Sequence, residues 1–301
     1  MSTEVSGVLL IHKQGGKTSH DVVGAVRRLF HTRRVGHTGT LDPMATGVLV
    51  VLVGRAAKAA EYLSVKNKSY RAVMRLGLTT DTEDTTGKTL TVSGDIPSPE
   101  RVIEVANGFA GEILQTPPMY SALKVNGQKL CDLARKGIEI EREARPVTIH
   151  SITCQHLTEN DYELSVSCSS GTYIRTLCAD IGKALGCGGA MAALCRTETG
   201  GFPLCACHTI EEIDALCDEK RVALLLPTEQ LFDELDRVCL PAFYEKLCRS
   251  GCEIYQKKIA TDYPVGTRVR LCSQQGEFFA LGEVREYESG SAIKSIKMFD
   301  V

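Results

Sequence analysis

Two periods of apolar and polar residues along the chain predict where strands and helices lie. Residues 7–11 and 48–53 are continuously apolar, which is typical of short buried strands. Residues 69–77 alternate instead, and the alternation predicts a strand with Tyr70 on the face that the core covers. The same alternation returns at Tyr162, Leu164, Val166 and Cys168. The chain is therefore expected to build a sheet from strands that lie far apart in sequence.

In other segments the apolar residues recur at the spacing of a helix. From Ser19, the expected N-cap, one face of a helix carries an apolar stripe formed by Val22, Val23, Val26, Leu29 and Phe30. A second helix is expected to begin near Thr172 and to end at Gly186, with an apolar face formed by Ile174, Leu177, Cys178, Ile181 and Leu185. Residues 130–135 suit a shorter helix.

Together these elements predict an α+β fold: a large, mixed but mostly antiparallel sheet with helices packed on it and a cleft across one face. Near the end of the chain short strands alternate with turn residues such as Pro241, Gly251 and Pro264. We expect this tail to be a small β-rich module. The expected domains are residues 1–236 and residues 237–301.

Composition restricts the class of protein. The chain has 301 residues, 43% of them hydrophobic and 24% charged, which suits a globular protein with one large domain and a small one. It has no apolar run as long as a membrane span, and Met1 to Glu4 lack the basic start of a signal peptide. Its thirteen scattered cysteines indicate reduced thiols, so we expect a cytoplasmic protein without membrane contact.

The charge balance restricts the mode of nucleic-acid binding. A formal net charge of −2 argues against a protein that coats nucleic acid non-specifically, but it is compatible with one folded RNA as partner. Basic side chains gather at residues 27–37 and again at residues 124–145. Acidic residues are interleaved in the second group, so a solvated, charge-mixed surface is the simpler interpretation of that one.

The most informative segment runs from Gly36 to Leu49 and reads GHTGTLDPMATGVL. Its single carboxylate, Asp42, stands before a proline in a glycine-punctuated turn and is followed by the apolar run at 48–53. Loops held by a rigid strand often carry catalytic groups, but an aspartate before a proline is also a common turn residue. The turn alone leaves both interpretations open.

Arg175 is the second candidate. It falls in the first turn of the helix expected from Thr172, where the helix dipole disfavours a cation. An anion nearby would explain it, and so would plain solvation of an arginine at a helix start.

Three other patterns are weaker. Residues 12–18 end in Gly-Lys-Thr, as a phosphate-binding loop does, but Ile11 stands where that loop requires a glycine. Residues 81–87 are acidic, but a calcium loop would need a glutamate where Val92 lies, and we interpret them as a polar turn. Residues 205–208 include two cysteines and a histidine without a partner at zinc-finger spacing, so no metal is expected.

The segment around Asp42 is similar to the catalytic-aspartate motif of the TruB family of tRNA pseudouridine synthases, which reads close to GHTGTLDPxATGVL. Four further stretches resemble that family in the same chain order, namely 8–21, 70–87, 117–146 and 171–182, and the tail resembles its PUA-like RNA-binding module. The resemblance implies a pseudouridine synthase fold and the conversion of uridine 55 in the T-loop of tRNA to pseudouridine, without cofactor or metal. Residues 117–146 would form a thumb that closes on the RNA.

The resemblance also implies roles for single residues. Asp42 would be the essential carboxylate, Tyr70 would stack on a uracil flipped out of the RNA, and Arg175 would pair with Asp42 and hold its pKa low. Further residues match substrate-side positions of the family: Lys13, His37, Tyr173 and Leu194.

Two positions depart from the family pattern, and two other functions compete with it. Gln14 replaces a proline, and Cys195 replaces the first of two arginines. A glycoside or N-glycosyl hydrolase would usually need two carboxylates at a defined separation, whereas Asp42 stands alone in its motif. A non-catalytic tRNA-binding chaperone would need the basic segments but neither Asp42 nor Arg175. The expected partner is the T-arm of tRNA, bound by a monomer.

Overall fold

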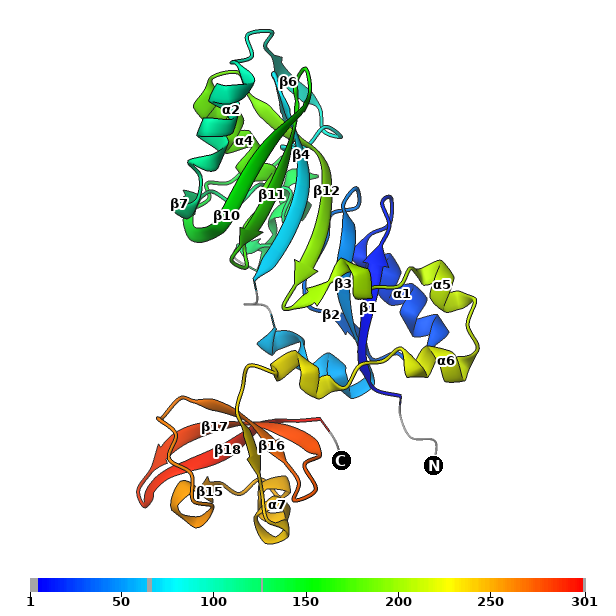
Figure 1. Cartoon of the computed structure of the whole chain (residues 1–301), viewed down its shortest axis with the longest axis vertical. Coiled ribbons are helices and arrows are strands. Elements are labelled where there is room, and N and C mark those ends of the chain that lie inside the picture. The colour runs from blue at the N-terminus through cyan, green and yellow to red at the C-terminus, as the bar shows by residue number, and fades with distance from the viewer. Residues whose placement is uncertain (1–4, 64–66, 126, 300–301) are drawn as a thin grey trace.

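The computed structural model describes residues 5–63, 67–125 and 127–299 of an elongated molecule (Figure 1). Within these ranges the large sheet has nine strands. Its order is β1 (Gly7–Lys13), β3 (Thr46–Val53), β12 (Gly189–Thr199), β4 (Lys68–Leu76), β11 (Asp161–Cys168), β10 (Arg145–Thr158) and β7 (Gly111–Gln115), while β2 (Val35–His37) pairs with β3 and β13 (Phe202–Pro203) with β12. Among the described strand pairs of this sheet only β3 with β12 is parallel, so the expected α+β fold with a mostly antiparallel sheet is confirmed.

Strands β1 and β3 are buried on both faces, which explains their unbroken apolar sequence. On one face Leu49 and Val51 pack into the main core together with helix α1 (Ser19–Leu29). On the other face Val48 and Val50 pack into a second cluster, which includes Phe299 from the C-terminal module. These two strands therefore join the two parts of the molecule.

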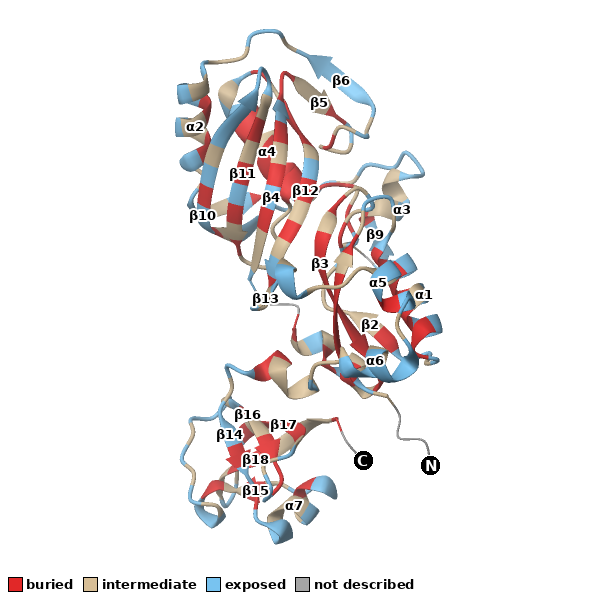
Figure 2. Cartoon of the chain, turned by 45° about the vertical axis from the view of Figure 1, so that its right-hand side comes forward, coloured by how far each residue is buried: buried red, intermediate tan, exposed pale blue. Residues whose placement is uncertain are grey.

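The central strands have one covered face and one open face, as the alternation predicts. In β4 the side chains of Tyr70 and Ala72 are buried, while Arg71 and Arg75 are exposed on the opposite face. Helices α2 (Pro99–Asn107) and α4 (Ile174–Leu185) lie on the covered side. Figure 2 shows buried residues alternating with intermediate or exposed ones along β11.

Helix α1 begins where expected, but the expected cap is wrong. Thr18 is the N-cap, and its hydroxyl accepts a bond from the backbone of Asp21, whose carboxylate accepts one from the Thr18 backbone in return. An acidic residue three positions after Thr18 closes this capping box, which Ser19 cannot form. Ser19 is buried instead.

Helix α4 starts two residues later than the expected Thr172. It ends at Gly186, as expected, and this glycine has the left-handed conformation.

Two small hairpins flank the site described below. Strands β5 (Leu78–Thr80) and β6 (Thr89–Val92) enclose the acidic turn, residues 81–87. Strands β8 (Lys124–Val125) and β9 (Gln128–Lys129) precede α3 (Leu130–Ala134), which confirms the short helix expected there. Asn126, inside the segment 117–146, lies outside the described residues.

The remaining elements are a 3₁₀ helix directly after β3, the connection to the tail and the tail itself. They are the helices α5 (Ile210–Asp214), α6 (Asp218–Ala223) and α7 (Ala242–Arg249), the 3₁₀ helices Gly54–Tyr62, Leu204–Ala206, Thr228–Phe232 and Gln256–Lys258, and the strands β14 (Arg237–Cys239), β15 (Ile254–Tyr255), β16 (Arg268–Cys272), β17 (Phe278–Tyr287) and β18 (Gly290–Met298). The five strands make one sheet in the order β14-β16-β17-β18-β15, which confirms a β-rich tail.

All thirteen cysteines lie in the described part of the chain, and each is a free thiol. Within the described ranges no helix combines the length and apolarity needed to cross a bilayer.

Candidate active site

A cavity of about 340 Å³ opens between the loop before β3, the start of α4 and the covered face of β4 and β12. Several residues singled out from the sequence line it, namely Asp42, Tyr70, Tyr173, Arg175 and Leu194. They come from four separate segments of the chain, which the fold brings together. Lys13 and His37 are absent from its described lining.

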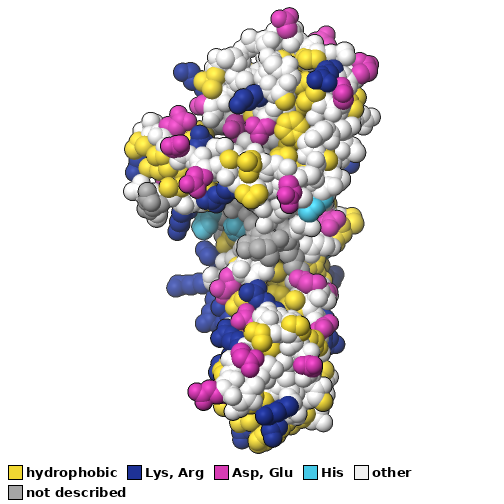
Figure 3. Space-filling view, turned by 90° about the vertical axis from the view of Figure 1, so that its left-hand side faces the viewer, with side chains coloured by type: hydrophobic (Ala, Val, Ile, Leu, Met, Phe, Trp, Pro, Cys, Tyr) yellow, Lys and Arg dark blue, Asp and Glu magenta, His cyan; other side chains and the backbone are white. Residues whose placement is uncertain are grey.

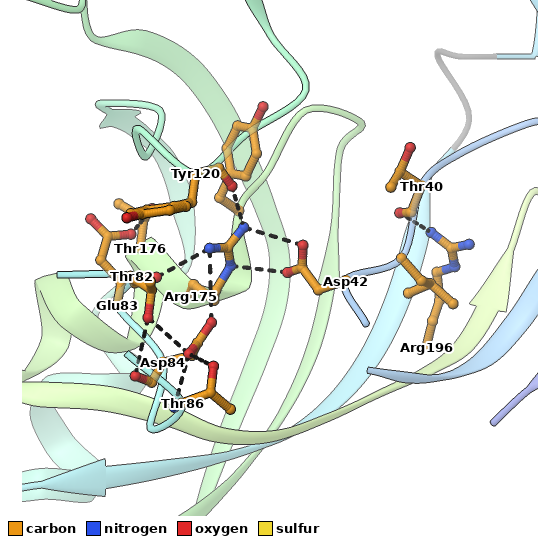
Figure 4. A network of polar contacts seen from close by, with 12 residues as sticks. Thr40, Asp42, Thr82, Glu83, Asp84, Thr86, Tyr120, Arg175, Thr176 and Arg196 are labelled. Atoms are coloured by element: carbon orange, nitrogen blue, oxygen red, sulfur yellow. Dashed lines mark hydrogen bonds and ion pairs between the residues drawn. The ribbon is translucent and has the colours of Figure 1, made fainter. Parts of the chain in front are cut away.

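Asp42 and Arg175 form a two-point ion pair at the wall of this cavity (Figure 4). Arg175 Nε lies 2.9 Å from Asp42 Oδ2, and Arg175 Nη2 donates to Asp42 Oδ1 at 3.2 Å. The Arg175 side chain is 6% exposed, whereas that of Asp42 is 34% exposed. The carboxylate is thus fixed by the buried guanidinium while it still faces the cavity.

The other donors of Arg175 hold the guanidinium itself. Nη2 donates to the Tyr120 carbonyl at 2.8 Å, and Nη1 donates to the Thr82 carbonyl at 3.1 Å. Nη1 also lies 3.9 Å from Asp84 Oδ2. A cation in the first turn of α4 is explained by these anionic and carbonyl partners, which compensate for the unfavourable helix dipole.

The acidic turn is part of the site, which the sequence analysis missed. Asp84 is 6% exposed, and its Oδ1 accepts bonds from the hydroxyls of Thr82 and Thr86 at 2.8 and 2.6 Å. Glu83 accepts a 2.6 Å bond from the Thr176 hydroxyl of α4. The segment is a polar turn, as expected, but it packs on α4 beside Arg175, a contact that the sequence did not reveal. A run of threonines between the acids was the available signal, because hydroxyl donors let carboxylates be buried.

The expectation of a depressed pKa for Asp42 is wrong in sign. Burial raises the pKa of Asp42 above its ordinary value; the Arg175 guanidinium opposes this shift and the charge of Asp84 adds to it. Asp42 and Asp84 thus share the Arg175 guanidinium, and the surrounding protein shields the Asp42 carboxylate from water.

The loop on both sides of Asp42 is anchored to neighbouring elements. Leu41 donates its backbone N–H to the Ser19 hydroxyl at 2.9 Å and accepts a bond from it at 3.1 Å. The carbonyl of Pro43 accepts bonds from Gly16 N and from the Lys13 ammonium, at 2.9 and 3.2 Å. Asp42 is therefore held between two fixed residues.

Lys13 serves this anchoring. It is 1% exposed, and its ammonium donates to the carbonyls of Gln14, Lys17 and Pro43. An ammonium has three N–H donors, and three carbonyls use them. This geometry gives Lys13 a role in supporting the loop that carries Asp42, while its place on the substrate side stays a prediction.

Arg196 anchors the loop from the other side. It is 1% exposed, and it donates to the carbonyls of Val48, Thr40 and Gly39 at 2.8, 3.4 and 3.2 Å. Cys195, the departure from the family pattern, alternates with Leu194 and Arg196 along β12 and so lies on the opposite face of that strand. The missing arginine therefore leaves the cavity lining unchanged.

Tyr70 and Leu194 form the apolar floor of the cavity. Both are 8% exposed, and Tyr70 stands directly opposite Arg196 in the pairing of β4 with β12. Burial raises the pKa of the Tyr70 hydroxyl, so this ring remains neutral. Such a floor is suited to receive a flat, uncharged ring.

Tyr173 lines the cavity at the start of α4, whereas His37 lies outside the lining. Tyr173 is the N-cap of α4, and its backbone is held by the buried Gln115 side chain, which accepts from Tyr173 N at 2.8 Å and donates to Tyr173 O at 3.0 Å. His37 ends β2, and burial lowers its pKa, with the charge of Arg196 acting in the same direction. His37 is therefore expected to be neutral near physiological pH.

The face shown in Figure 3 carries a projecting lobe, with lysine, arginine and histidine side chains gathered on the surface below it. Among the described residues, no group of three or more histidine, cysteine, aspartate or glutamate side chains is arranged to hold a metal ion.

Comparison with known proteins decides the family. The model of the TruB family pseudouridylate synthase N-terminal domain matches residues 27–174, and that of the tRNA pseudouridylate synthase B C-terminal domain matches residues 175–242. The chain belongs to the TruB family of pseudouridylate synthases. The family resemblance of the motif around Asp42 is thereby confirmed, while residues 243–301 lie beyond both matches.

Curated relatives cover nearly the whole chain. The tRNA pseudouridine synthase B of Alkaliphilus oremlandii is 42% identical over 93% of this chain and 94% of its own length. That of Clostridium kluyveri is 40% identical over 98% of this chain and 100% of its own length. A chain in the crystal structure of a Cbf5-Nop10-Gar1 complex is 27% identical, with a TM-score of 0.75 over 98% of this chain and 85% of that chain. The similarity to these proteins therefore extends over nearly the whole chain.

Proposed function

We propose that this protein isomerises uridine 55 in the T-loop of tRNA to pseudouridine. The observation that carries the proposal is the Asp42–Arg175 pair, which presents a fixed carboxylate to a cavity floored by Tyr70 and Leu194. The curated relatives named above are tRNA pseudouridine synthases, and they cover the Asp42 and Arg175 regions of the chain.

The reaction needs each of these groups. The bond between ribose C1′ and base N1 must break, the freed uracil must turn, and C1′ must then join C5, which afterwards loses its proton. The nucleotide has to leave its stack in the RNA to enter the cavity, where Tyr70 and Leu194 would hold the detached ring. Asp42 would act on the ribose as an ionised carboxylate, either by attack at C1′ or by removal of the C2′ proton, and Arg175 would keep it ionised and aimed.

Binding of the RNA would use surfaces outside the cavity. In the segment 117–146, Lys124 and Lys129 are exposed, and the base of the segment is tied to the catalytic pair where Arg175 bonds the Tyr120 carbonyl. This segment would close on the T-arm as a thumb. Residues 237–301 would add contacts to another part of the tRNA as a PUA-like module, in a monomeric, cytoplasmic enzyme that requires no cofactor.

A direct test uses unmodified tRNA transcripts. After incubation with the protein, a carbodiimide that marks pseudouridine is expected to stop reverse transcription at position 55, and a transcript with cytidine at that position is the matched control. Tight binding of the transcript without any such stop would favour a non-catalytic chaperone. Release of free uracil would favour a hydrolase.

A further inference from the structure

Lys68 reaches the cavity from the same strand face as Tyr70. The two residues are separated by one position in β4, so their side chains leave the strand on the same side. Lys68 lines the cavity together with Asp42 and Tyr70. Its Cε lies 3.7 Å from the point that a Cβ on Gly39 would occupy, so the aliphatic stem lies beside the loop that carries Asp42.

A second cation stands beside it. Arg196 Nη1 lies 3.6 Å from the same point at Gly39, so the Lys68 and Arg196 side chains converge there. The guanidinium of Arg196 is engaged with the carbonyls of Gly39, Thr40 and Val48. Lys68 carries its ammonium on a flexible aliphatic stem, in a side chain that is only partly buried.

This arrangement is electrostatically costly in the free protein. Burial lowers the pKa of Lys68, and the charge of Arg196 lowers it further. An anion that enters the cavity between these two cations and the opposite wall would offset their mutual repulsion. The Asp42 carboxylate is already held by Arg175 at that other wall.

The proposed reaction creates such an anion. When the C1′–N1 bond breaks, its electron pair stays on N1 and is delocalised onto the O2 and O4 oxygens of the uracil. The charge disappears when C5 bonds to C1′, and the C5 proton is finally replaced by one on N1. Lys68 can remain protonated throughout.

We propose that Lys68 is a catalytic residue that stabilises the uracil anion as the glycosidic bond breaks. The inference rests on the proposed function and adds a role for a cation other than Arg175. A fixed positive charge acts where negative charge develops in the transition state, and loss of one such group typically slows a reaction about a hundredfold or more.

The test compares variants in single-turnover reactions at saturating enzyme. Lys68→Met is expected to lower the rate about a hundredfold, with tRNA affinity within about threefold of wild type. Lys68→Arg keeps the charge and should recover most of the rate. Lys68→Gln provides a second neutral variant in case Met impairs folding, which thermal unfolding would reveal. Arg71→Met is the matched control, because it removes a cation from the opposite, exposed face of the same strand.

A substrate whose base leaves more easily tests the cleavage of the C1′–N1 bond separately. Fluorine at C5 withdraws electrons and stabilises the uracil anion, so the defect of Lys68→Met should shrink below about tenfold when loss of 5-fluorouridine at the target position is measured. A neutral variant at wild-type rate would overturn the proposal. So would an equal defect with both substrates, which indicates a structural role, or a loss confined to affinity, which indicates a phosphate contact. Failure of wild type to make pseudouridine would instead overturn the proposed function.

Discussion

Arg175 is the residue on which the geometry of the site depends. Its side chain contacts the loop of Asp42, the acidic turn and the base of segment 117–146 at once. Its planar fork makes this possible, because five N–H donors point in fixed directions. A small displacement of any of these segments is therefore transmitted to the Asp42 carboxylate.

Two substitutions of Arg175 distinguish the effect of its charge from the effect of its two-point grip on Asp42. Arg175→Lys keeps the charge but loses the two-point grip, so the single-turnover rate should fall strongly, by about a hundredfold, with little change in its pH dependence. Arg175→Met should be at least as slow, and it also removes the charge that opposes the raised pKa of Asp42. Its rate should therefore need a higher pH to reach its plateau.

The sign follows from the protonation state that reacts. Asp42 must be ionised, so the rate falls as pH drops through its pKa, which burial already raises above the ordinary value. Without Arg175 that pKa rises further, and the acid limb moves to higher pH. Measurement of the rate from about pH 4 to pH 9 tests this. Near wild-type rates in both variants, with unchanged pH profiles, would contradict the pairing as a functional one.

The sequence could predict the central residues but not all their partners. Asp42, Tyr70 and Arg175 stand in motifs, so resemblance points to them directly. Asp84 does not, because its role arises when residues 81–87 fold back on α4, and local acidity says nothing about that contact. The sign of the Asp42 pKa shift was missed for a related reason: burial depends on the whole cavity wall.

At the scale of elements, the close approach of β12 to β3 fixes the position of the loop that carries Asp42. Gly47 has a φ of +106°, and a Cβ there would lie 2.2 Å from the Arg196 carbonyl oxygen. The glycine of the motif at this position is thus required for the parallel pairing of Arg196 with Gly47. Arg196 and its bonds to Gly39 and Thr40 depend on that pairing.

Gly47→Ala is expected to destabilise the fold by about 2 kcal/mol or more, since both the backbone conformation and the available space exclude a methyl group. Urea unfolding of the purified protein measures this. Gly24→Ala is the control: it lies on α1 with nothing within 4 Å of the added atom, and it should stabilise by about 0.5–1 kcal/mol. Equal stabilities of the two variants would show that β12 does not hold the loop as described.

Element positions were largely predictable because they depend on local period. The stop of α4 at Gly186 and the alternation in β4 follow from residues close in sequence. The cap of α1 was placed one residue late, because Ser19 is as good a capping residue as Thr18 until the reciprocal bond from Asp21 is considered.

At the scale of the whole molecule, a shared hydrophobic cluster joins the C-terminal module to the part of the chain that contains β1 and β3. Phe299 is 7% exposed, and its ring lies 5.7 Å from that of Phe232 and 5.4 Å from that of Phe278. These rings belong to the same cluster as Val48 and Val50 of β3. The turn residues of the sequence predicted a module, but this docking needs the long-range packing that the fold supplies.

Phe299→Ala is expected to lower the free energy of unfolding by about 3 kcal/mol, because it opens a cavity between the two parts. Phe243→Ala, at a side chain that is 67% exposed, should change it by less than about 0.5 kcal/mol. Thermal and urea unfolding measure both variants. If Phe299→Ala were as stable as Phe243→Ala, the module would be an independent attachment, and its removal from Arg237 onward would leave the catalytic part intact.

The central claim is that Asp42 performs the chemistry of a pseudouridine synthase, and release of tritium from tRNA labelled at uracil C5 tests it most directly. Wild type should release one tritium for each tRNA modified, without loss of uracil. Asp42→Asn should bind tRNA within a few-fold of wild type and release tritium at less than about one hundredth of its rate, because phosphate contacts supply most of the binding and the carboxylate supplies the reaction. Release by Asp42→Asn at a rate near that of wild type would contradict the account.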